Sequence, residues 1–142
     1  ELKVFPIMYQ LLYVSNASNL MSDDDLKSLL TNAKTNNISL NVTGMLVYHD
    51  GSFIQILEGD KDQVESLFHK ISKDKRHNNI ILIDERNIDT RCFPNWDMAF
   101  KKLTKSDLDK FPSISNLINN SSQDEFNNLT DIVESFITLS VN

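Results

Sequence analysis

The first third of the chain combines a β-prone run with a helical pattern. Residues 9–15 are rich in tyrosine, leucine and valine and end in turn-forming residues, so we predict a strand there. Ser22 then precedes three aspartates, an arrangement typical of a helix N-terminus. Apolar residues recur from Leu26 at i, i+3, i+4 and i+7, which predicts a helix that ends near Asn36 and Asn37.

The middle of the chain predicts a hairpin followed by a second helix. Two β-prone runs, 40–48 and 52–57, are separated by an Asp-Gly pair that favours a tight turn, so the two strands should pair antiparallel. Asp60, with Gln63 three residues further on, is placed to cap a helix. The apolar spacing continues this helix as far as Ile71.

Two more strands complete the pattern. The continuous apolar run 80–83 is typical of a strand that is buried on both faces, and a short strand is expected over 96–103, after Pro94. The order β-α-β-β-α-β-β contains two split β-α-β units. It predicts an α+β ferredoxin-like sandwich with both helices on one side of the sheet, followed by two C-terminal helices.

The last part of the chain indicates two helical segments. Ser106 is placed to cap the first, which Pro112 interrupts, and Ser122 opens the second. These helices either cover the other face of the sheet or form an oligomer or output interface, and the sequence leaves both interpretations open. We divide the chain into a leader or expression remnant (1–7), a sandwich domain (8–103) and a C-terminal helical extension (104–142).

Composition narrows the class of protein. The 142 residues carry 14 basic and 20 acidic side chains and a formal net charge of -6, which does not favour nucleic acid as a partner. No apolar run approaches the roughly 18–20 residues of a membrane span, and the sequence shows no secretory signal pattern. We therefore expect a soluble, cytoplasmic protein with no membrane partner and no direct nucleic-acid partner.

Motifs of the common enzyme classes do not occur in the sequence. It contains no Gly-rich phosphate loop, no His-Glu-x-x-His motif, no nucleophile elbow and no cysteine pair. One cysteine, Cys92, and three histidines argue against a structural zinc site. Cys92 and His77 have the chemistry of a nucleophile and a base, but nothing in the sequence brings them together. We predict neither a metal site nor an enzymatic activity.

Polar residues stand where the pattern predicts a core. Gln55 lies in an otherwise apolar strand, and a buried amide without partners costs about 1–3 kcal/mol. Because side chains alternate along a strand, Gln55 and Tyr13 should face the same side of the sheet, where the hydroxyl can meet the amide. The pair is either a hydrogen bond that merely satisfies two core groups or part of a ligand site.

Two further pairs of residues also allow two interpretations. Asn36 and Asn37 either cap the end of their helix or point their amides into a cleft between the two helices, where they would bind a flat heteroaromatic ligand. Trp96 and Met98 share one side of the last strand and are either core residues or contacts beside such a ligand.

Taken together, these positions resemble the BLUF family, the sensors of blue light using FAD. The resemblance covers about residues 9–103, with the motifs in the family's order. It rests on Leu11-Leu12-Tyr13-Val14-Ser15, Asn36-Asn37 before Val42-Thr43-Gly44, Phe53-Ile54-Gln55-Ile56-Leu57-Glu58-Gly59, Asp74-Lys75-Arg76-His77 and Phe93-Pro94-Asn95-Trp96-Asp97-Met98. In that family the fold is the ferredoxin-like sandwich and the flavin ring lies between the two helices. Asp97 stands where serine is common and Val42 where isoleucine is common, and Asp97 leaves the signalling state of the last strand open.

The resemblance implies a role for each matched residue. Tyr13 would donate an electron and a proton to the excited flavin, and Gln55 would bridge Tyr13 to flavin N5 and O4. Asn37 would pair with the flavin edge at O4 and N3, with Asn36 as a neighbouring contact toward the ribityl chain. Four residues would lie near the phosphate and adenine part or be surface charges alone: Lys70, Asp74, Arg76 and His77.

The implied function is a blue-light receptor that binds FAD without a covalent bond. Trp96 and Met98 would relay the change to the last strand, the C-terminal helices and then an effector. That effector is a partner protein or, if the chain is an excised input module, the nucleotide cyclase domain of a photoactivated adenylyl cyclase. We also expect a homodimer or higher oligomer. The alternative is a ferredoxin-like ligand-binding or interaction domain without photochemistry, in which the Tyr13–Gln55 pair is inert.

Overall fold

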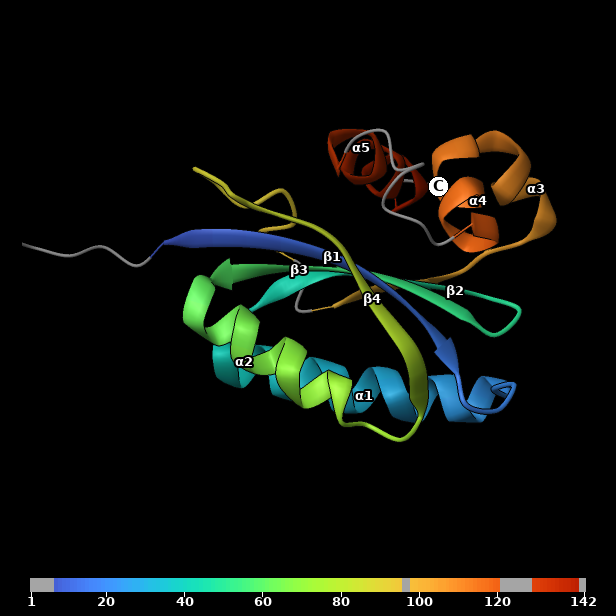
Figure 1. Cartoon of the computed structure of the whole chain (residues 1–142), viewed down its shortest axis with the longest axis horizontal. Helices are drawn as coiled ribbons and strands as arrows, with labels where there is room; N and C mark the ends of the chain where they lie inside the picture. The colour runs from blue at the N-terminus through green and yellow to red at the C-terminus, as the bar shows by residue number, and fades with distance from the viewer. Residues whose placement is uncertain (1–6, 96–97, 121–128, 141–142) are drawn as a thin grey trace, which may run out of the picture.

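The computed structural model describes residues 7–95, 98–120 and 129–140, which form a five-stranded sheet between two layers of helices (Figure 1). The elements are β1 (Met8–Ala17), α1 (Asp23–Leu40), β2 (Thr43–His49), β3 (Ser52–Asp60), α2 (Lys61–Ser72), β4 (His77–Asn87), β5 (Ala99–Lys102), α3 (Lys105–Lys110), α4 (Pro112–Asn120) and α5 (Leu129–Ser140). Helices α1 and α2 cover one face of the sheet, and α4 and α5 lie over the other (Figure 1).

The sheet confirms the ferredoxin-like prediction. Its strand order is β4-β1-β3-β2-β5, and each neighbouring pair is antiparallel except β2 and β5, which run parallel. The strand β1 therefore lies between β3 and β4, and its register with β3 places Tyr13 opposite Gln55. We call the side under α1 and α2 the cleft face and the side under α4 and α5 the cap face.

Helix α1 begins as predicted but ends later. Ser22 and Asp25 form a capping box, in which the Ser22 hydroxyl accepts from the Asp25 N–H at 3.1 Å. The helix ends at Asn41, whose left-handed backbone (φ 54°) closes the last turn. The C-capping interpretation of Asn36 and Asn37 is therefore wrong, because both lie inside the helix. Leu40, predicted to open the next strand, is also helical.

The hairpin between β2 and β3 has the predicted turn. Asp50 and Gly51 both have positive φ (44° and 87°), as a tight turn between antiparallel strands requires. Gly44 in β2 has a packing reason, because a Cβ there would lie 1.9 Å from the backbone oxygen of Ile56 on β3. Asp60 caps α2 as predicted, and its carboxylate accepts from the N–H of Asp62.

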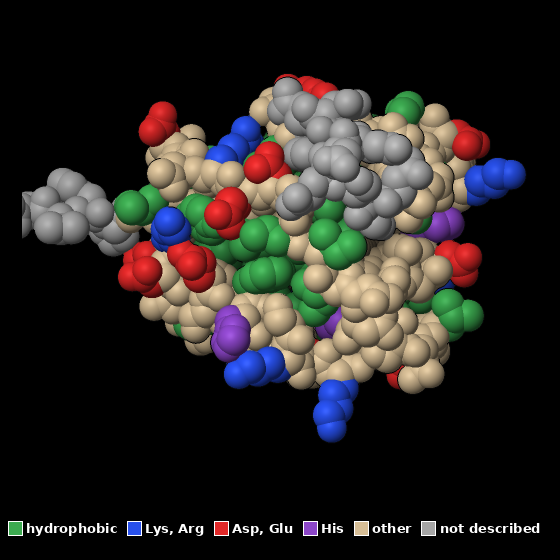
Figure 2. Space-filling model, viewed as in Figure 1, with side chains coloured by type: hydrophobic (Ala, Val, Ile, Leu, Met, Phe, Trp, Pro, Cys, Tyr) green, Lys and Arg blue, Asp and Glu red, His purple; other side chains and the backbone are tan. Residues whose placement is uncertain are grey.

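Strand β4 contradicts the prediction of a strand buried on both faces. It lies at the edge of the sheet, paired with β1 alone among the described strands. Ile83 is buried, but Ile81 is 38% exposed. Figure 2 shows hydrophobic side chains gathered in the middle of the face along which β4 runs. A short apolar run does not distinguish a central strand from an edge strand whose apolar side chains reach the surface.

The C-terminal helices differ in detail from their prediction. Thr104, not Ser106, caps α3 through a capping box with Asp107, and α4 begins at Pro112, a residue suited to a first helical turn. The described residues thus contain three helices here rather than two. Ser122, predicted to open the last one, lies outside the described residues, as do residues 1–6 of the predicted leader.

Two hydrophobic clusters hold the layers together. On the cap face, Leu12, Ile54 and Ile56 pack with α4 and α5, where Ile114 and Phe136 are fully buried. The cleft-face cluster contains Leu11, Leu57, Leu26 and Leu67, but also tyrosines and Met98. The C-terminal helices thus cover the second face, which is one of the two interpretations that the sequence left open. Within the described residues, no helix is long and apolar enough to cross a membrane.

Candidate functional site

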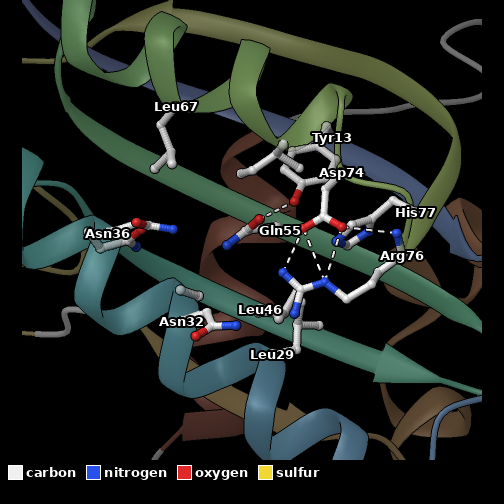
Figure 3. A pocket seen from close by; sticks show the side chains of 13 residues that line it. Tyr13, Leu29, Asn32, Asn36, Leu46, Gln55, Leu67, Asp74, Arg76 and His77 are labelled. Atoms are coloured by element: carbon white, nitrogen blue, oxygen red, sulfur yellow. Dashed lines mark hydrogen bonds and ion pairs between the residues drawn. The ribbon is translucent and has the colours of Figure 1, made fainter.

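A cavity of about 450 Å³ opens on the cleft face between α1 and α2 (Figure 3). Its walls combine aliphatic side chains with amides and charged groups: Tyr13, Leu29, Asn32, Ala33, Asn36, Asn37, Leu46, Gln55, Leu67, Ile71, Asp74, Arg76 and His77. An outer groove of about 640 Å³ shares several of these walls and adds Thr35 and Lys70. Together they make one path from the sheet outward between the helices.

Tyr13 and Gln55 form the floor of the cavity. They are direct partners across β1 and β3, and the Tyr13 hydroxyl donates to Oε1 of Gln55 (Figure 3). Both side chains are buried, at 1% and 3% exposure. Burial, with a smaller contribution from the negative charge of Asp74, raises the pKa of the Tyr13 phenol far above its ordinary value. The phenol is therefore protonated at neutral pH and able to donate.

Met98 contacts Gln55 from the β5 side of the sheet. Its sulfur accepts from Nε2 of Gln55 at 3.3 Å, and its side chain is 2% exposed. A thioether is a weak acceptor, so among the described residues this amide nitrogen has a weak partner on the cavity side of the sheet. Met98, one member of the predicted relay pair, thus touches Gln55. Trp96, the other member, lies outside the described residues.

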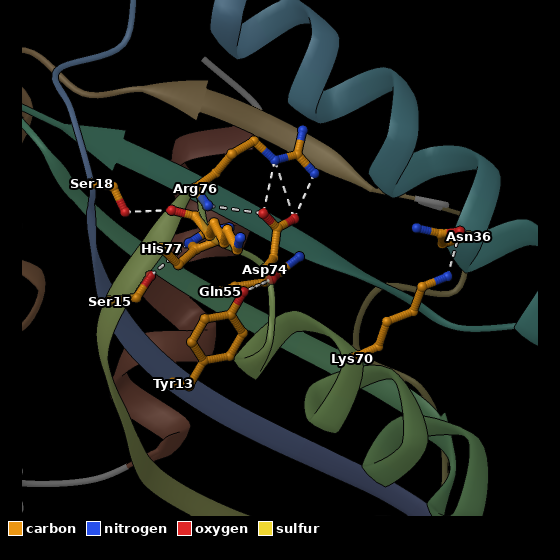
Figure 4. Close-up of polar contacts among 10 residues, drawn as sticks. Tyr13, Ser15, Ser18, Asn36, Gln55, Lys70, Asp74, Arg76 and His77 are labelled. Carbon is orange, nitrogen blue, oxygen red and sulfur yellow. Dashed lines mark hydrogen bonds and ion pairs between the residues drawn. The ribbon is translucent and has the colours of Figure 1, made fainter.

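An ion pair between Asp74 and Arg76 forms one wall. Nη2 of Arg76 lies 2.6 Å from Oδ2 of Asp74, and Nε lies 3.1 Å from each carboxylate oxygen (Figure 4). The hydrogen bonds from Arg76 hold the pKa of the Asp74 carboxyl below its usual range, and the same contacts raise the pKa of Arg76. The pair lies in the connection between α2 and β4, beside the Tyr13–Gln55 pair (Figure 3).

His77 continues this wall at the first residue of β4. Its Nδ1 lies 3.0 Å from the Ser15 hydroxyl (Figure 4). Its ring centroid lies 4.7 Å from that of Phe53. Burial lowers the pKa of His77; the charge of Asp74 opposes this shift, and that of Arg76 adds to it. His77 is therefore the neutral, semi-buried member of a wall that also holds a charged pair.

The asparagines contribute from α1. Asn37 is 1% exposed and lines the inner cavity, whereas Asn36 lies at the boundary with the outer groove. Oδ1 of Asn36 accepts from Nζ of Lys70 on α2 at 3.4 Å, across the mouth of the groove (Figure 4). Both amides therefore reach the cleft, which is the ligand-binding interpretation of the sequence.

The structure brings most of the predicted site residues together, but the residues expected near the phosphate and adenine part lie in two different places. Asp74, Arg76 and His77, expected near a phosphate and adenine part, line the inner cavity beside Tyr13. Lys70 lies in the outer groove and not in the inner cavity. Within that expected group, Lys70 alone is thus confined to the outer part of the path.

Sequence reasoning missed Ser15 and Asn32. Ser15 shares the strand side of Tyr13, two residues away, and binds His77. Asn32 lies one helical turn before Asn36 and lines both the cavity and the groove. The periodicity of a strand and of a helix would have found each of them once Tyr13 and Asn36 were singled out.

The cavity fits a flavin ring by the chemistry of its walls. Leu29, Leu46 and Leu67 supply apolar surface for a flat aromatic system, and Asn37 and Gln55 supply amides for its polar edge. The outer groove adds the cation of Lys70, which suits an anionic phosphate tail. The residues present therefore fit FAD.

Comparison with known proteins agrees with this chemistry. The family model described as "BLUF: Sensors of blue-light using FAD" matches residues 8–99. The photoactivated adenylate cyclase subunit alpha of Euglena gracilis is 35% identical over 129 residues, which are 91% of this chain and 12% of that relative. The chain thus spans a small part of the curated relatives it matches.

Solved structures give the same result. The photo-activated state of BlsA has a TM-score of 0.75 and 30% identity and covers 96% of both chains. A bacterial light-regulated adenylyl cyclase has a TM-score of 0.72 and 33% identity over 81% of this chain and 34% of that one. The similarity to the cyclase is again confined to a part of it.

Proposed function

Because the chain belongs to the BLUF family, the sensors of blue light using FAD, we propose that it is a blue-light switch operated by Tyr13 and Gln55. One observation carries the proposal. The Tyr13 hydroxyl binds the Gln55 amide on the floor of the cavity, while the amide nitrogen meets a weak thioether acceptor. An oxidisable phenol is thus coupled to a group that can exchange donor for acceptor.

The cavity walls divide the work of holding the cofactor. Bound FAD supplies a chromophore that absorbs blue light and, once excited, accepts an electron. Asn37 and Gln55 would hold the polar edge of the ring, and Asn36 would lie toward the ribityl chain. Lys70 would serve the outer, anionic part. Asp74, Arg76 and His77 would border the ring beside Tyr13.

Tyr13 is the electron and proton donor of this site. Its phenol would give up one electron, and its hydroxyl proton would pass to Oε1 of Gln55 while Gln55 releases one Nε2 proton toward the flavin, so that the side chain of Gln55 stays neutral. Gln55 can respond by rotating or by adopting its imidic tautomer, and either change exchanges donor and acceptor on the side that faces the cavity. The electron and the proton would return to Tyr13 while the Gln55 amide stays rearranged, and the amide would revert in the dark, so the cycle is reversible and leaves no covalent bond.

Met98 links this change to the rest of the chain. A Gln55 amide that reverses its donor and acceptor no longer donates to the Met98 sulfur in the same way. Met98 directly precedes β5, which leads through Thr104 into α3. We place the output in β5 and the C-terminal helices, with Trp96 as the proposed second member of the relay.

The effector lies beyond the photosensory module. The family model that matches describes a light sensor, and the matched relatives include adenylate cyclase subunits of which this chain spans 12%. We propose that the signal reaches a partner protein or a cyclase-type output domain. A dimer or higher oligomer is also proposed, supported by the edge position of β4 and the exposed Ile81.

The test is the absorption spectrum of the FAD-loaded protein under blue light. The wild-type chain is expected to show a red shift that reverses in the dark. Tyr13→Phe removes the electron and proton donor, and Gln55→Leu removes the reversible amide, so each is expected to abolish the shift. Tyr9→Phe is the matched control, because Tyr9 lies on the same side of β1 but does not line the cavity.

The outcomes separate the competing functions. A normal reversible shift in Tyr13→Phe or Gln55→Leu would contradict the proposed switch. A wild-type protein that binds FAD but shows no shift would support the alternative, a ligand-binding domain with an inert Tyr13–Gln55 pair.

A further inference from the structure

A buried carboxylate lies on the cap face of the sheet, outside the flavin cavity. Glu58 in β3 has no exposed surface and is three residues from Gln55, so its side chain points to the opposite face. Its oxygens accept from Nε2 of Gln10 at 3.1 Å and from the N–H of Cys92 at 3.0 Å. They also accept from the N–H of Phe93 and, at 3.4 Å, from the hydroxyl of Thr43. A carboxyl group buried at this depth requires such a set of hydrogen-bond partners.

Two of these donors belong to the segment that leads to Met98. Residues 88–95 follow β4 without regular structure, and Glu58 binds the backbone of this segment at Cys92 and Phe93. Arg91 adds bonds to the Thr43 hydroxyl at 2.8 Å and to the backbone oxygen of Asn41 at 2.7 Å. The segment before Met98 is thus fixed to the sheet, and the contact of Met98 with Gln55 depends on where this segment lies.

The same carboxylate is connected to helix α5. Oε1 of Gln10, whose amide nitrogen binds Glu58, accepts from Nε of Arg86 at 2.8 Å. Nη1 of Arg86 donates to the hydroxyl of Thr130 at 2.9 Å, in the first turn of α5. A continuous series of hydrogen bonds therefore runs from the Met98 segment through Glu58, Gln10 and Arg86 to α5.

We propose that Glu58 is a positioning residue that fixes the Met98 segment and, through Gln10 and Arg86, couples its place to the docking of α5. Charged and bidentate-capable groups suit this task, because their hydrogen bonds are directional and strong. The part of the proposal that concerns light rests on the proposed function, since Met98 is displaced only if Gln55 changes its hydrogen bonds. The part that concerns the dark protein stands on these contacts alone.

The first arm of the test uses the FAD-loaded chain in the dark. Amide hydrogen exchange is measured for residues 88–95 and for α5. Glu58→Gln keeps one acceptor oxygen but adds donors, so exchange is expected to rise roughly tenfold or more in both regions. Thr130→Val is expected to raise exchange in α5 alone. Thr138→Val is the matched control, because the Thr138 hydroxyl binds the Glu134 backbone of its own helix.

Hydrogen exchange in the dark decides whether Glu58 is coupled to α5. If Glu58→Gln loosens residues 88–95 and leaves α5 unchanged, the coupling does not exist. If it raises exchange equally throughout the sheet, Glu58 has a general structural role and the proposal fails. Should Glu58→Gln not fold, Thr130→Val still tests the α5 link, since exchange in α5 equal to that of Thr138→Val contradicts it.

The second arm compares dark and illuminated samples. Blue light is expected to raise exchange in α5 in the wild-type chain and in Thr138→Val. Thr130→Val should keep the flavin red shift and lose this light-dependent difference. A difference as large as in the wild type overturns the coupling, as does a wild type that shifts its spectrum without any change in α5. If no spectral shift occurs, the proposed function fails, while the dark arm still decides the role of Glu58.

Discussion

The two faces of the sheet differ in how their buried polar groups are partnered. On the cleft face, the Gln55 amide nitrogen contacts a thioether beside a cavity of about 450 Å³. On the cap face, three residues further along β3, the Glu58 carboxylate accepts from four donors of the chain. The same strand therefore carries an amide with bonding capacity to spare on one side and a saturated carboxylate on the other.

This difference shows which buried polar group serves a ligand. A native core satisfies its polar groups, so a buried amide with a weak partner beside a cavity points to a molecule that completes its hydrogen bonds. A saturated group such as Glu58 instead fixes the chain around it. Burial alone does not separate the two residues, because Gln55 and Glu58 are both almost inaccessible to solvent.

Replacing each residue with leucine gives the largest expected contrast. In the flavin-free chain, Glu58→Leu should lower the free energy of unfolding by about 3–5 kcal/mol, because two backbone N–H groups and the Gln10 amide lose their acceptor. Gln55→Leu should cost about 1 kcal/mol, because the Tyr13 hydroxyl faces a cavity that water can enter. Denaturant unfolding followed by circular dichroism measures both values.

Ile56→Leu controls for the shape of leucine in this strand. It lies between the two positions, is fully buried, and should cost less than about 1.5 kcal/mol. Equal losses of unfolding free energy for Glu58→Leu and Gln55→Leu would contradict the difference between the cap face, with its fully partnered carboxylate, and the cleft face.

Asn37 is the buried amide that α1 contributes to the cleft face. Asn37→Ala removes a buried amide from the cavity wall and should weaken FAD binding by about tenfold, the equivalent of about 1.4 kcal/mol. Titration of the flavin-free protein with FAD measures the dissociation constant. The stabilisation of the fold by a fixed excess of FAD should fall by the same amount.

Asn41→Gly is the matched control for that change. Asn41 caps α1 in a left-handed conformation that glycine also adopts, and it does not line the cavity. Its FAD affinity should equal that of the wild type. An unchanged affinity of Asn37→Ala for FAD would mean that the Asn37 amide does not bind FAD on the cleft face.

The sequence predicted the fold largely through local signals. Ser22 before three aspartates and the Asp50–Gly51 turn have short-range physical causes, and both occur in the structure as predicted. The meeting of Tyr13 and Gln55 also followed from the alternation along two strands, once the ferredoxin-like order made these strands neighbours. Family membership confirmed the type of receptor and its cofactor.

The parts that the sequence did not predict depend on long-range packing. The run at residues 80–83 has the composition of a central strand, and only the completed sheet makes β4 an edge. Asn41 rather than Asn36 or Asn37 ends α1, and several asparagines offered the same local signal. The bonds of Glu58 join β1, β3 and an irregular segment more than 30 residues away, so no local pattern indicates them.

The smallest predicted effect is a pH dependence that belongs to the cleft face. Burial lowers the folded-state pKa of His77 below its ordinary value near 6.5, so the unfolded chain binds more protons between these two values. The contribution of His77 to stability is therefore complete above about pH 6.5 and declines as the pH falls toward the folded pKa. Unfolding free energies of the flavin-free chain between about pH 5 and pH 8 measure it.

The slope from one proton cannot exceed about 1.4 kcal/mol per pH unit, and the partial burial of His77 keeps it below that limit. His77→Gln should flatten the curve in this range. Asp74 does not contribute to the slope between about pH 5 and pH 8. The pKa of its carboxyl is lowered, so the stability that it contributes is lost only at more acidic pH. If His77→Gln kept the full slope, the pH dependence of the stability would not come from His77 on the cleft face and would originate elsewhere in the chain.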